Sequence, residues 1–174
     1  MSSFRRIPNR LPRPSYVGRQ IYFVTICSAQ RKPVFTRSAL VALFLDVLRD
    51  KCSVHSFNVY AFCFMPDHLH LVLLGASDHS NLIALLRDFK GTSAARARVQ
   101  GFVALWQKGF YDHVLRSGAA LDAVAWYIFN NPVRAGLAEE MGEWPYSGSW
   151  MFDWKKLTAP VRQFAPPWKK AVAG

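Results

Sequence analysis

Acidic residues are missing from both ends of this chain. The first acid among its 174 residues is Asp46, whereas eight arginines and lysines precede that position, and five lysines and arginines follow Asp153 with no acid among them. In total, 22 basic residues oppose 11 acidic ones, a net charge of +11. One-signed stretches favour a polyanionic partner, because each neutralised phosphate releases counterions. The charge therefore favours nucleic acid, although solvated basic ends of a soluble protein would give the same count.

Long hydrophobic runs and paired cysteines are also missing. No stretch of about 18 uncharged apolar residues exists to span a bilayer, and the arginine-rich start is not followed by the apolar core of a signal peptide. Three scattered cysteines in apolar runs indicate reduced core residues, not disulfides or zinc ligands. The sequence shows no basic amphipathic helix of the kind that binds a membrane surface. We therefore expect a cytoplasmic protein, associated with the nucleoid if its partner is DNA.

The apolar periodicity predicts an α+β fold. The expected strands are 20–27, 57–64 and 68–74, with candidate strands at 103–106 and 110–115, and the expected helices are 38–50, 81–99 and 119–130, with a short one from 133. Residues 68–74 are apolar on both faces, which is typical of a central strand. The order matches a ferredoxin-like split βαβ fold: an antiparallel sheet with helices on one face, a further C-terminal helix, and the other face free for a ligand.

The chain shows no internal repeat and no linker that would divide it into two domains. The 51% hydrophobic composition suffices for one ordinary core. We expect a basic, flexible arm over 1–18, a single domain over 19–150, and a basic, irregular tail over 151–174.

His68 and His70 are separated by one residue in a predicted strand. Alternate residues of a strand share a face, so the two imidazoles could converge on one metal ion. Such a pair needs at least one more ligand. Two hydrogen-bonded core histidines explain the pattern about equally well. Asp67 would face the other way if the strand has already begun, so it is not counted as a ligand.

Tyr127 and Asn131 lie four residues apart in a predicted helix and therefore on one face. The Asn131 carbonyl oxygen suits Mg²⁺ or Mn²⁺. A phenol with an ordinary pKa near 10 is a poor nucleophile, but a nearby divalent cation could polarise a target phosphate. For an arbitrary helical tyrosine, packing against the sheet is the more common role.

Three segments carry a family resemblance: FMPDHLHLVL at 64–73, WQ at 106–107 with YDH at 111–113, and YIFNNPVRAG at 127–136. Together they resemble the REP-associated tyrosine transposases, of the single-tyrosine branch of the HUH endonucleases. The resemblance extends from about residue 22 to 150. Here the HUH triplet, in which U is a bulky hydrophobic residue, is His68, Leu69 and His70.

The resemblance implies a DNA-cleaving and rejoining transposase that acts on single-stranded DNA near hairpins of repetitive extragenic palindromes. Tyr127 would be the nucleophile and would form a 5′-phosphotyrosine with a free 3′-hydroxyl. His68, His70 and Asn131 would bind Mg²⁺ or Mn²⁺. Related insertion-sequence transposases usually have glutamine as the last ligand, and asparagine is one methylene shorter.

Several basic and aromatic side chains could contact DNA. The N-terminal arginines could enter a groove or hold bases beside a hairpin, the basic face of helix 81–99 could bind phosphates or simply be solvated, and Arg134 could contact the backbone. The predicted DNA-binding residues are Arg5, Arg6, Arg10, Arg13, Arg87, Lys90, Arg96 and Arg134. Four tryptophans, Trp144, Trp150, Trp154 and Trp168, could stack on unpaired bases or cover the core. Asp112 should face away from Tyr111 and His113, which argues against a hydrolytic dyad.

Two other functions stay open at this point. A metal-bound water could be the nucleophile, with Tyr127 only positioning it. Alternatively, the chain could be a non-catalytic module that binds single-stranded nucleic acid on a ferredoxin-like sheet. The oligomeric state, monomer or homodimer, is also open.

Overall fold

The computed structural model describes residues 13–116 and 119–166. Its elements, in chain order, are η1 (Arg13–Tyr16), β1 (Ile21–Cys27), η2 (Ala29–Arg31), α1 (Ser38–Val54), β2 (Phe57–Met65), β3 (His68–Gly75), α2 (Leu82–Arg98), β4 (Tyr111–Leu115), α3 (Ala119–Phe129), α4 (Asn131–Arg134), β5 (Ser147–Gly148) and η3 (Trp154–Lys156). Arg5, Arg6 and Arg10 lie outside the described residues, and so does the side chain of Arg13.

The sheet is antiparallel, with the strand order β4-β1-β3-β2-β5. The first four strands have the order expected of the ferredoxin-like split βαβ arrangement, so the predicted fold class is confirmed. β3 lies in the middle between β1 and β2, as its two apolar faces predicted. The short β5 adds a fifth strand that the sequence did not suggest.

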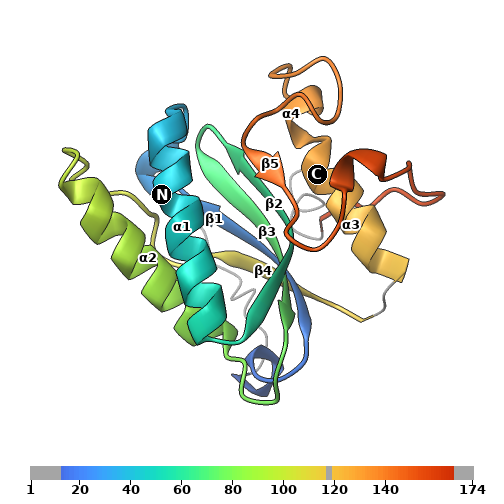
Figure 1. Ribbon diagram of the computed structural model, residues 1–174, viewed down its shortest axis with the longest axis horizontal. Coiled ribbons are helices and arrows are strands. Elements are labelled where there is room, and N and C mark those ends of the chain that lie inside the picture. Colours follow the sequence, from blue (N-terminus) through green and yellow to red (C-terminus); the bar gives the residue numbers. More distant parts are fainter. Residues whose placement is uncertain (1–12, 117–118, 167–174) are drawn as a thin grey trace, which may run out of the picture.

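One face of the sheet packs against α1 and α2. Figure 1 shows these two helices side by side on the same side of the strands. Alternate residues of β1 and β3, such as Val24 and Leu71, are fully buried there with Phe44 of α1 and Phe89 of α2. Burial of large apolar side chains of this kind is the main favourable term in folding.

The opposite face is covered as well, which corrects the prediction of a free face. α3 lies on that side in Figure 1, and its residues Val124 and Ile128 pack with Phe23 of β1 and Val72 of β3 in a second buried cluster. The composition of α3 explains this position, because every one of its residues except Asp122 is largely apolar and gains from burial. Among the described residues, a cavity opens beside this cover.

Residues 103–106 do not form the predicted strand. Within the described chain, Trp106 makes only an isolated bridge to Ser28. The apolar side chains here serve the core: the Trp106 ring lies 5.1 Å from that of Phe35, and its indole N–H donates to Ser93 Oγ at 2.9 Å. The pattern arises from burial and not from strand pairing.

Both predicted extensions contribute to the folded body. Tyr16 is buried and its hydroxyl donates to Asp112 at 3.0 Å, so the arm predicted over 1–18 ends before this residue. In the tail, the Trp154 ring packs on Phe129 with centroids 4.5 Å apart. Trp144 donates its indole N–H to the Phe64 carbonyl at 2.8 Å. These tryptophans cover the core, whereas Trp168 lies outside the described residues.

The three cysteines are buried and free of disulfides, as predicted. Within the two described ranges, no helix has both the length and the apolar character needed to cross a membrane.

The buried contact between Tyr16 and Asp112 gives a stability prediction. Tyr16→Phe removes the donor to a buried carboxylate, so the free energy of unfolding should fall by roughly 1–3 kcal/mol in denaturant titrations. Tyr146→Phe is the matched control, because the Tyr146 hydroxyl makes an exposed, 3.5 Å contact with the Thr36 carbonyl. An unchanged stability of Tyr16→Phe would contradict the structural role of residue 16.

Candidate active site

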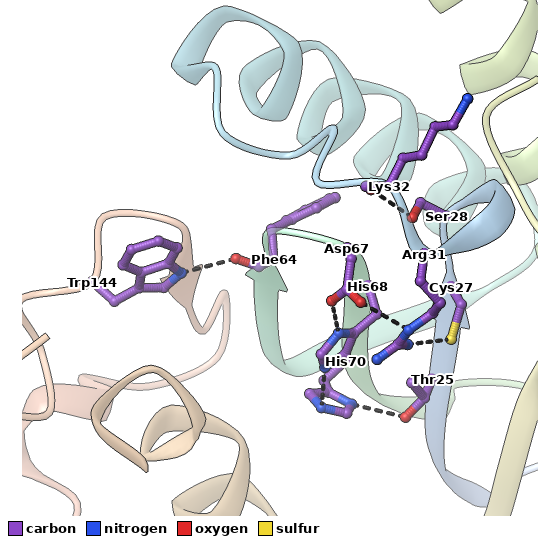
Figure 2. A network of polar contacts seen from close by, with 10 residues as sticks. All are labelled: Thr25, Cys27, Ser28, Arg31, Lys32, Phe64, Asp67, His68, His70 and Trp144. Atoms are coloured by element: carbon purple, nitrogen blue, oxygen red, sulfur yellow. Dashed lines mark hydrogen bonds and ion pairs between the residues drawn. The ribbon is translucent and has the colours of Figure 1, made fainter. Parts of the chain in front are cut away.

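The two histidines lie at the start of β3 on the face that packs against α3. Their Nε2 atoms are 3.0 Å apart. The outer Nδ1 atoms each have a polar partner: His68 Nδ1 is 2.6 Å from Asp67 Oδ1, and His70 Nδ1 is 2.8 Å from Thr25 Oγ1. Figure 2 shows this chain of contacts running from Asp67 through both imidazoles to Thr25. The arrangement orients both rings from behind and directs both Nε2 atoms to one point.

The hydrogens along this chain follow from the partners. A carboxylate only accepts, so His68 carries its proton on Nδ1 and donates it to Asp67. If His68 is neutral, it accepts at Nε2 from His70, and His70 Nδ1 then accepts from the Thr25 hydroxyl. For both Nε2 atoms to bind a cation, the His70 proton must move to Nδ1. The Thr25 oxygen can accept it there, because a hydroxyl both donates and accepts.

Asp67 also binds the arginine of a neighbouring turn. Its Oδ2 lies 2.8 Å from Arg31 Nε, so each carboxylate oxygen has its own partner. Arg31 Nη1 also lies 2.8 Å from Cys27 Sγ. Asp67 points back toward His68 and not into the position of a metal ligand. The sequence analysis did not count Asp67 as a ligand, and it did not foresee the contact through which Asp67 orients His68.

Tyr127 lies on α3 beside the histidine pair. Its side chain is buried, and its ring centroid is 6.1 Å from that of His70 and 6.0 Å from that of Phe23. The Phe164 ring of the C-terminal segment packs on it from 5.6 Å. The guanidinium carbon of Arg134 lies 5.2 Å from the centre of the tyrosine ring. Three rings and one cation therefore hold the phenol in place.

Asn131 begins α4, just after α3 ends at Phe129. Pro132 has no N–H, which breaks the regular hydrogen bonding at this point, yet the chain continues into the next turn through the bond from Arg134 N to Asn130 O at 3.0 Å. The Asn131 side chain is buried, and its Nδ2 has no hydrogen-bond partner among the described residues. Buried amide nitrogens without a partner are rare in folded interiors.

One cavity of about 570 Å³ joins these groups. It is lined by Thr25, Cys27, Arg31, Met65, His68, His70, Gln107, Tyr111, Tyr127, Asn131, Arg134 and Ala135. The predicted nucleophile and all three predicted ligands therefore open onto the same space, at the place where the cover over the sheet ends.

The donor set could hold a divalent cation. Two ligands at right angles around a metal at about 2.1 Å lie about 3.0 Å apart, which is the separation of the two Nε2 atoms. Among the described residues, no three histidine, cysteine or acidic side chains are placed so that they could hold one metal ion, so a third protein ligand must be of another type. A half-turn of the Asn131 amide exchanges Nδ2 for Oδ1 and would present an oxygen instead of the orphan donor.

Comparison with known proteins fixes the family. Residues 16–131 match the family model described as "Transposase IS200 like". The chain belongs to the IS200-like transposase family. The matched range begins at the buried Tyr16, spans the histidine pair and Tyr127, and ends at Asn131.

Individual relatives agree with this assignment. This chain is 23% identical over 150 residues to the REP-associated tyrosine transposase of Escherichia coli K12, and the match covers 84% of this chain and 82% of that relative. This chain is also 26% identical over 164 residues to a Haemophilus influenzae protein whose name assigns it provisionally to the same group. That match covers 84% of this chain and 85% of the relative. A solved REP-associated tyrosine transposase bound to a REP hairpin has the same fold, with a TM-score of 0.67 and 20% identity, covering 95% of this chain and 100% of that one.

The predicted DNA-contacting residues of this IS200-like transposase divide into two groups. Arg134 lines the cavity, whereas Arg87 and Arg96 are exposed on α2, on the other side of the sheet. Lys90 donates to the carbonyls of Gln107 and Gly109 at 2.7 and 2.8 Å and so fixes the loop before β4. Burial lowers the pKa of Lys90. The role of these α2 residues at DNA stays a prediction.

Sequence reasoning missed Thr25, Gln107 and the local role of Arg31. Thr25 lies directly opposite His70 in the pairing of β1 with β3. That neighbourhood depends on the strand register, which no single segment of sequence reveals. Asp112, by contrast, faces away from its neighbours toward Tyr16 as predicted.

The Thr25 contact predicts a change in metal affinity. Thr25→Val keeps the shape of the side chain but leaves His70 Nδ1 without its hydroxyl partner, so Mn²⁺ binding should weaken roughly 10–100-fold. Isothermal titration calorimetry measures the Mn²⁺ affinity, and Thr36→Val, at an exposed position, is the control. Equal Mn²⁺ affinities of Thr25→Val and wild type would remove Thr25 from the site.

Proposed function

We propose that this IS200-like transposase is a metal-dependent endonuclease and strand transferase of single-stranded DNA, which acts at REP-type hairpins through a 5′-phosphotyrosine. The observation on which this rests is the meeting of two elements: the imidazoles of β3 and the phenol of α3 open onto one cavity, with His70 and Tyr127 ring centroids 6.1 Å apart.

The relatives support the choice of substrate. Two curated relatives are named after REP elements, and a solved relative of the same fold is described as bound to a REP hairpin. The charge of this chain, +11 in total, suits a phosphate-rich partner. A cavity at the end of the sheet suits an extended single strand better than a rigid duplex.

The proposed step exchanges one phosphoester for another. Tyr127 Oη forms a bond to the target phosphorus while the bond to the 3′-oxygen breaks, and the electron pair goes to that oxygen. The phenolic proton passes to solvent and the departing 3′-oxygen is protonated, which leaves a 5′-phosphotyrosine and a free 3′-hydroxyl. Attack by a 3′-hydroxyl on the phosphotyrosine reverses the step and joins strands.

His68, His70 and Asn131 would hold Mg²⁺ or Mn²⁺ beside this phosphate. When bound, the cation polarises the phosphate and stabilises charge on the leaving oxygen. The remaining residues supply orientation. Asp67 and Thr25 hold the imidazoles from behind.

The nucleophile itself is held by its neighbours. The rings of Phe23 and Phe164 pack edge-on against Tyr127 and restrict its rotation. The Arg134 guanidinium on the tyrosine ring brings positive charge to the place where the phosphate must approach. A preorganised nucleophile of this kind lowers the entropic part of the barrier.

A covalent-capture assay tests the proposal. A labelled hairpin oligonucleotide with single-stranded flanks is incubated with protein and Mn²⁺ and analysed on a denaturing protein gel. Wild type should give a DNA adduct, whereas Tyr127→Phe should lower its yield at least about a thousandfold because the proposed nucleophilic oxygen is removed. Tyr146→Phe, which changes a partly buried tyrosine outside the cavity lining, should react like wild type.

Two other outcomes would overturn parts of the proposal. Metal-dependent cleavage without an adduct would make a bound water the nucleophile. DNA binding that is unaffected by chelator and by His70→Ala, with no cleavage, would make the chain a non-catalytic binding module.

A further inference from the structure

An anchored turn holds Arg31 at the edge of the cavity. Gln30 and Arg31 have φ angles of 57° and 56°. Residues other than glycine rarely adopt this region, and such strain persists only where the surroundings hold it. Ser28 holds the turn, because its hydroxyl donates to the Lys32 carbonyl at 2.7 Å and its N–H donates to the Asp67 carbonyl at 2.9 Å. Figure 2 shows Arg31 extending from this turn toward Asp67 and Cys27.

The guanidinium of Arg31 is only partly engaged by these neighbours. Its Nε binds Asp67 at 2.8 Å and its Nη1 binds Cys27 Sγ at 2.8 Å. A guanidinium has five N–H donors. Within the described part of the chain, these contacts engage two of them, and the side chain is 49% exposed while it lines the cavity. Three donors in a fixed plane are therefore available to an acceptor in the cavity.

An ion pair alone does not distinguish Arg31 from other arginines. Arg19 makes the same kind of contacts, with its Nε 3.0 Å from Asp78 Oδ1 and its Nη1 2.8 Å from the Ala76 carbonyl. Arg19, however, does not line the cavity. The difference lies in location: of these two guanidinium groups, only that of Arg31 faces the cavity that contains the histidine pair. A planar fork of this type matches the oxygens of a phosphate.

The strand pairing fixes the order of the groups along the cavity. The Tyr127 ring packs on His70. His70 pairs with Thr25, and the next register pair on the same face of the sheet is His68 with Cys27. Arg31 contacts Cys27. Tyr127 and Arg31 therefore lie toward opposite ends of the histidine pair.

This order gives the substrate strand a direction. In phosphoryl transfer the attacking and leaving oxygens lie roughly in line on opposite sides of the phosphorus. If the phenol attacks from the end occupied by Tyr127, the leaving 3′-oxygen points toward the other end. The nucleotide that carries it, and the phosphate on its 5′ side, then lie toward Arg31.

We propose that Arg31 binds the phosphate immediately 5′ of the cleaved phosphodiester, in the strand that leaves with the 3′-hydroxyl. The inference rests on the proposed function and deepens it, because it assigns one substrate phosphate to one side chain. Arg134, at the opposite end beside Tyr127, would instead contact the strand on the 3′ side of the cut. Arg31 thus keeps the departing strand close to the site for rejoining.

A double-mutant cycle between protein and DNA tests the assignment. The cut is first mapped with wild type, and single neutral methylphosphonates then replace each phosphate around it. Affinities are measured in chelator so that no cleavage occurs. Arg31→Ala should weaken binding of native DNA about tenfold or more. The methylphosphonate 5′ of the cut should weaken DNA binding by wild type to a similar extent. It should lower the affinity of Arg31→Ala for DNA hardly any further.

Matched variants keep the test independent of folding. Arg19→Ala removes an arginine of the same contact pattern and should show the full loss at that methylphosphonate, as wild type does. Arg31→Lys keeps the charge but not the fork, so it should recover only part of the affinity. If Arg31→Ala does not fold, the wild-type scan still decides, because a loss confined to phosphates 3′ of the cut would overturn the assignment.

The two levels of proposal fail separately. Normal adduct formation with additive losses in the cycle would overturn the Arg31 site and leave the phosphotyrosine mechanism intact. No adduct from wild type in the capture assay would overturn the mechanism, and with it the cut that defines the 5′ phosphate. No binding of wild type to the hairpin would overturn both.

Discussion

The site depends on the antiparallel register between β1 and β3. This pairing sets Thr25 against His70 and Cys27 against His68, so that a hydroxyl supports one imidazole and the Arg31–Asp67 pair supports the other. A slip of one residue would turn both histidines into the core that packs on α1 and α2. The fully buried Val24 and Leu71 on that opposite face make such a slip costly. The hydrophobic core thereby fixes the position of polar groups that it does not contain.

The second constraint is the apolar character of α3. Because this helix must bury its surface, it packs on the face of the sheet that bears the histidines and brings Tyr127 to them. The break at Pro132 then turns the chain and leaves Asn131 buried at the rim of the cavity. In small domains with one sheet, the same packing that stabilises the fold can thus assemble a site from distant segments. The candidate site residues line a cavity at the edge where this cover ends.

Periodicity alone was enough to predict the local features of the fold. The alternation around Leu69 placed both histidines on one face, and the order of elements gave the sheet topology. It could not give the neighbours that pairing creates, such as Thr25, nor the strained turn at Arg31, because both depend on contacts between distant segments. The free sheet face was wrong since the pattern of α3 does not say which face it covers. That the histidine and tyrosine faces meet was expected only from the family resemblance, and the packing of α3 explains it.

The central claim is that His68, His70 and Asn131 hold one divalent cation beside Tyr127. Crystals grown or soaked with Mn²⁺ test it most directly, through the anomalous scattering of the metal. We predict a single strong peak within bonding distance of both Nε2 atoms and of the Asn131 amide oxygen, on the side of the cavity that faces the phenol. A peak elsewhere, or histidines that keep their mutual hydrogen bond at saturating Mn²⁺, would contradict it.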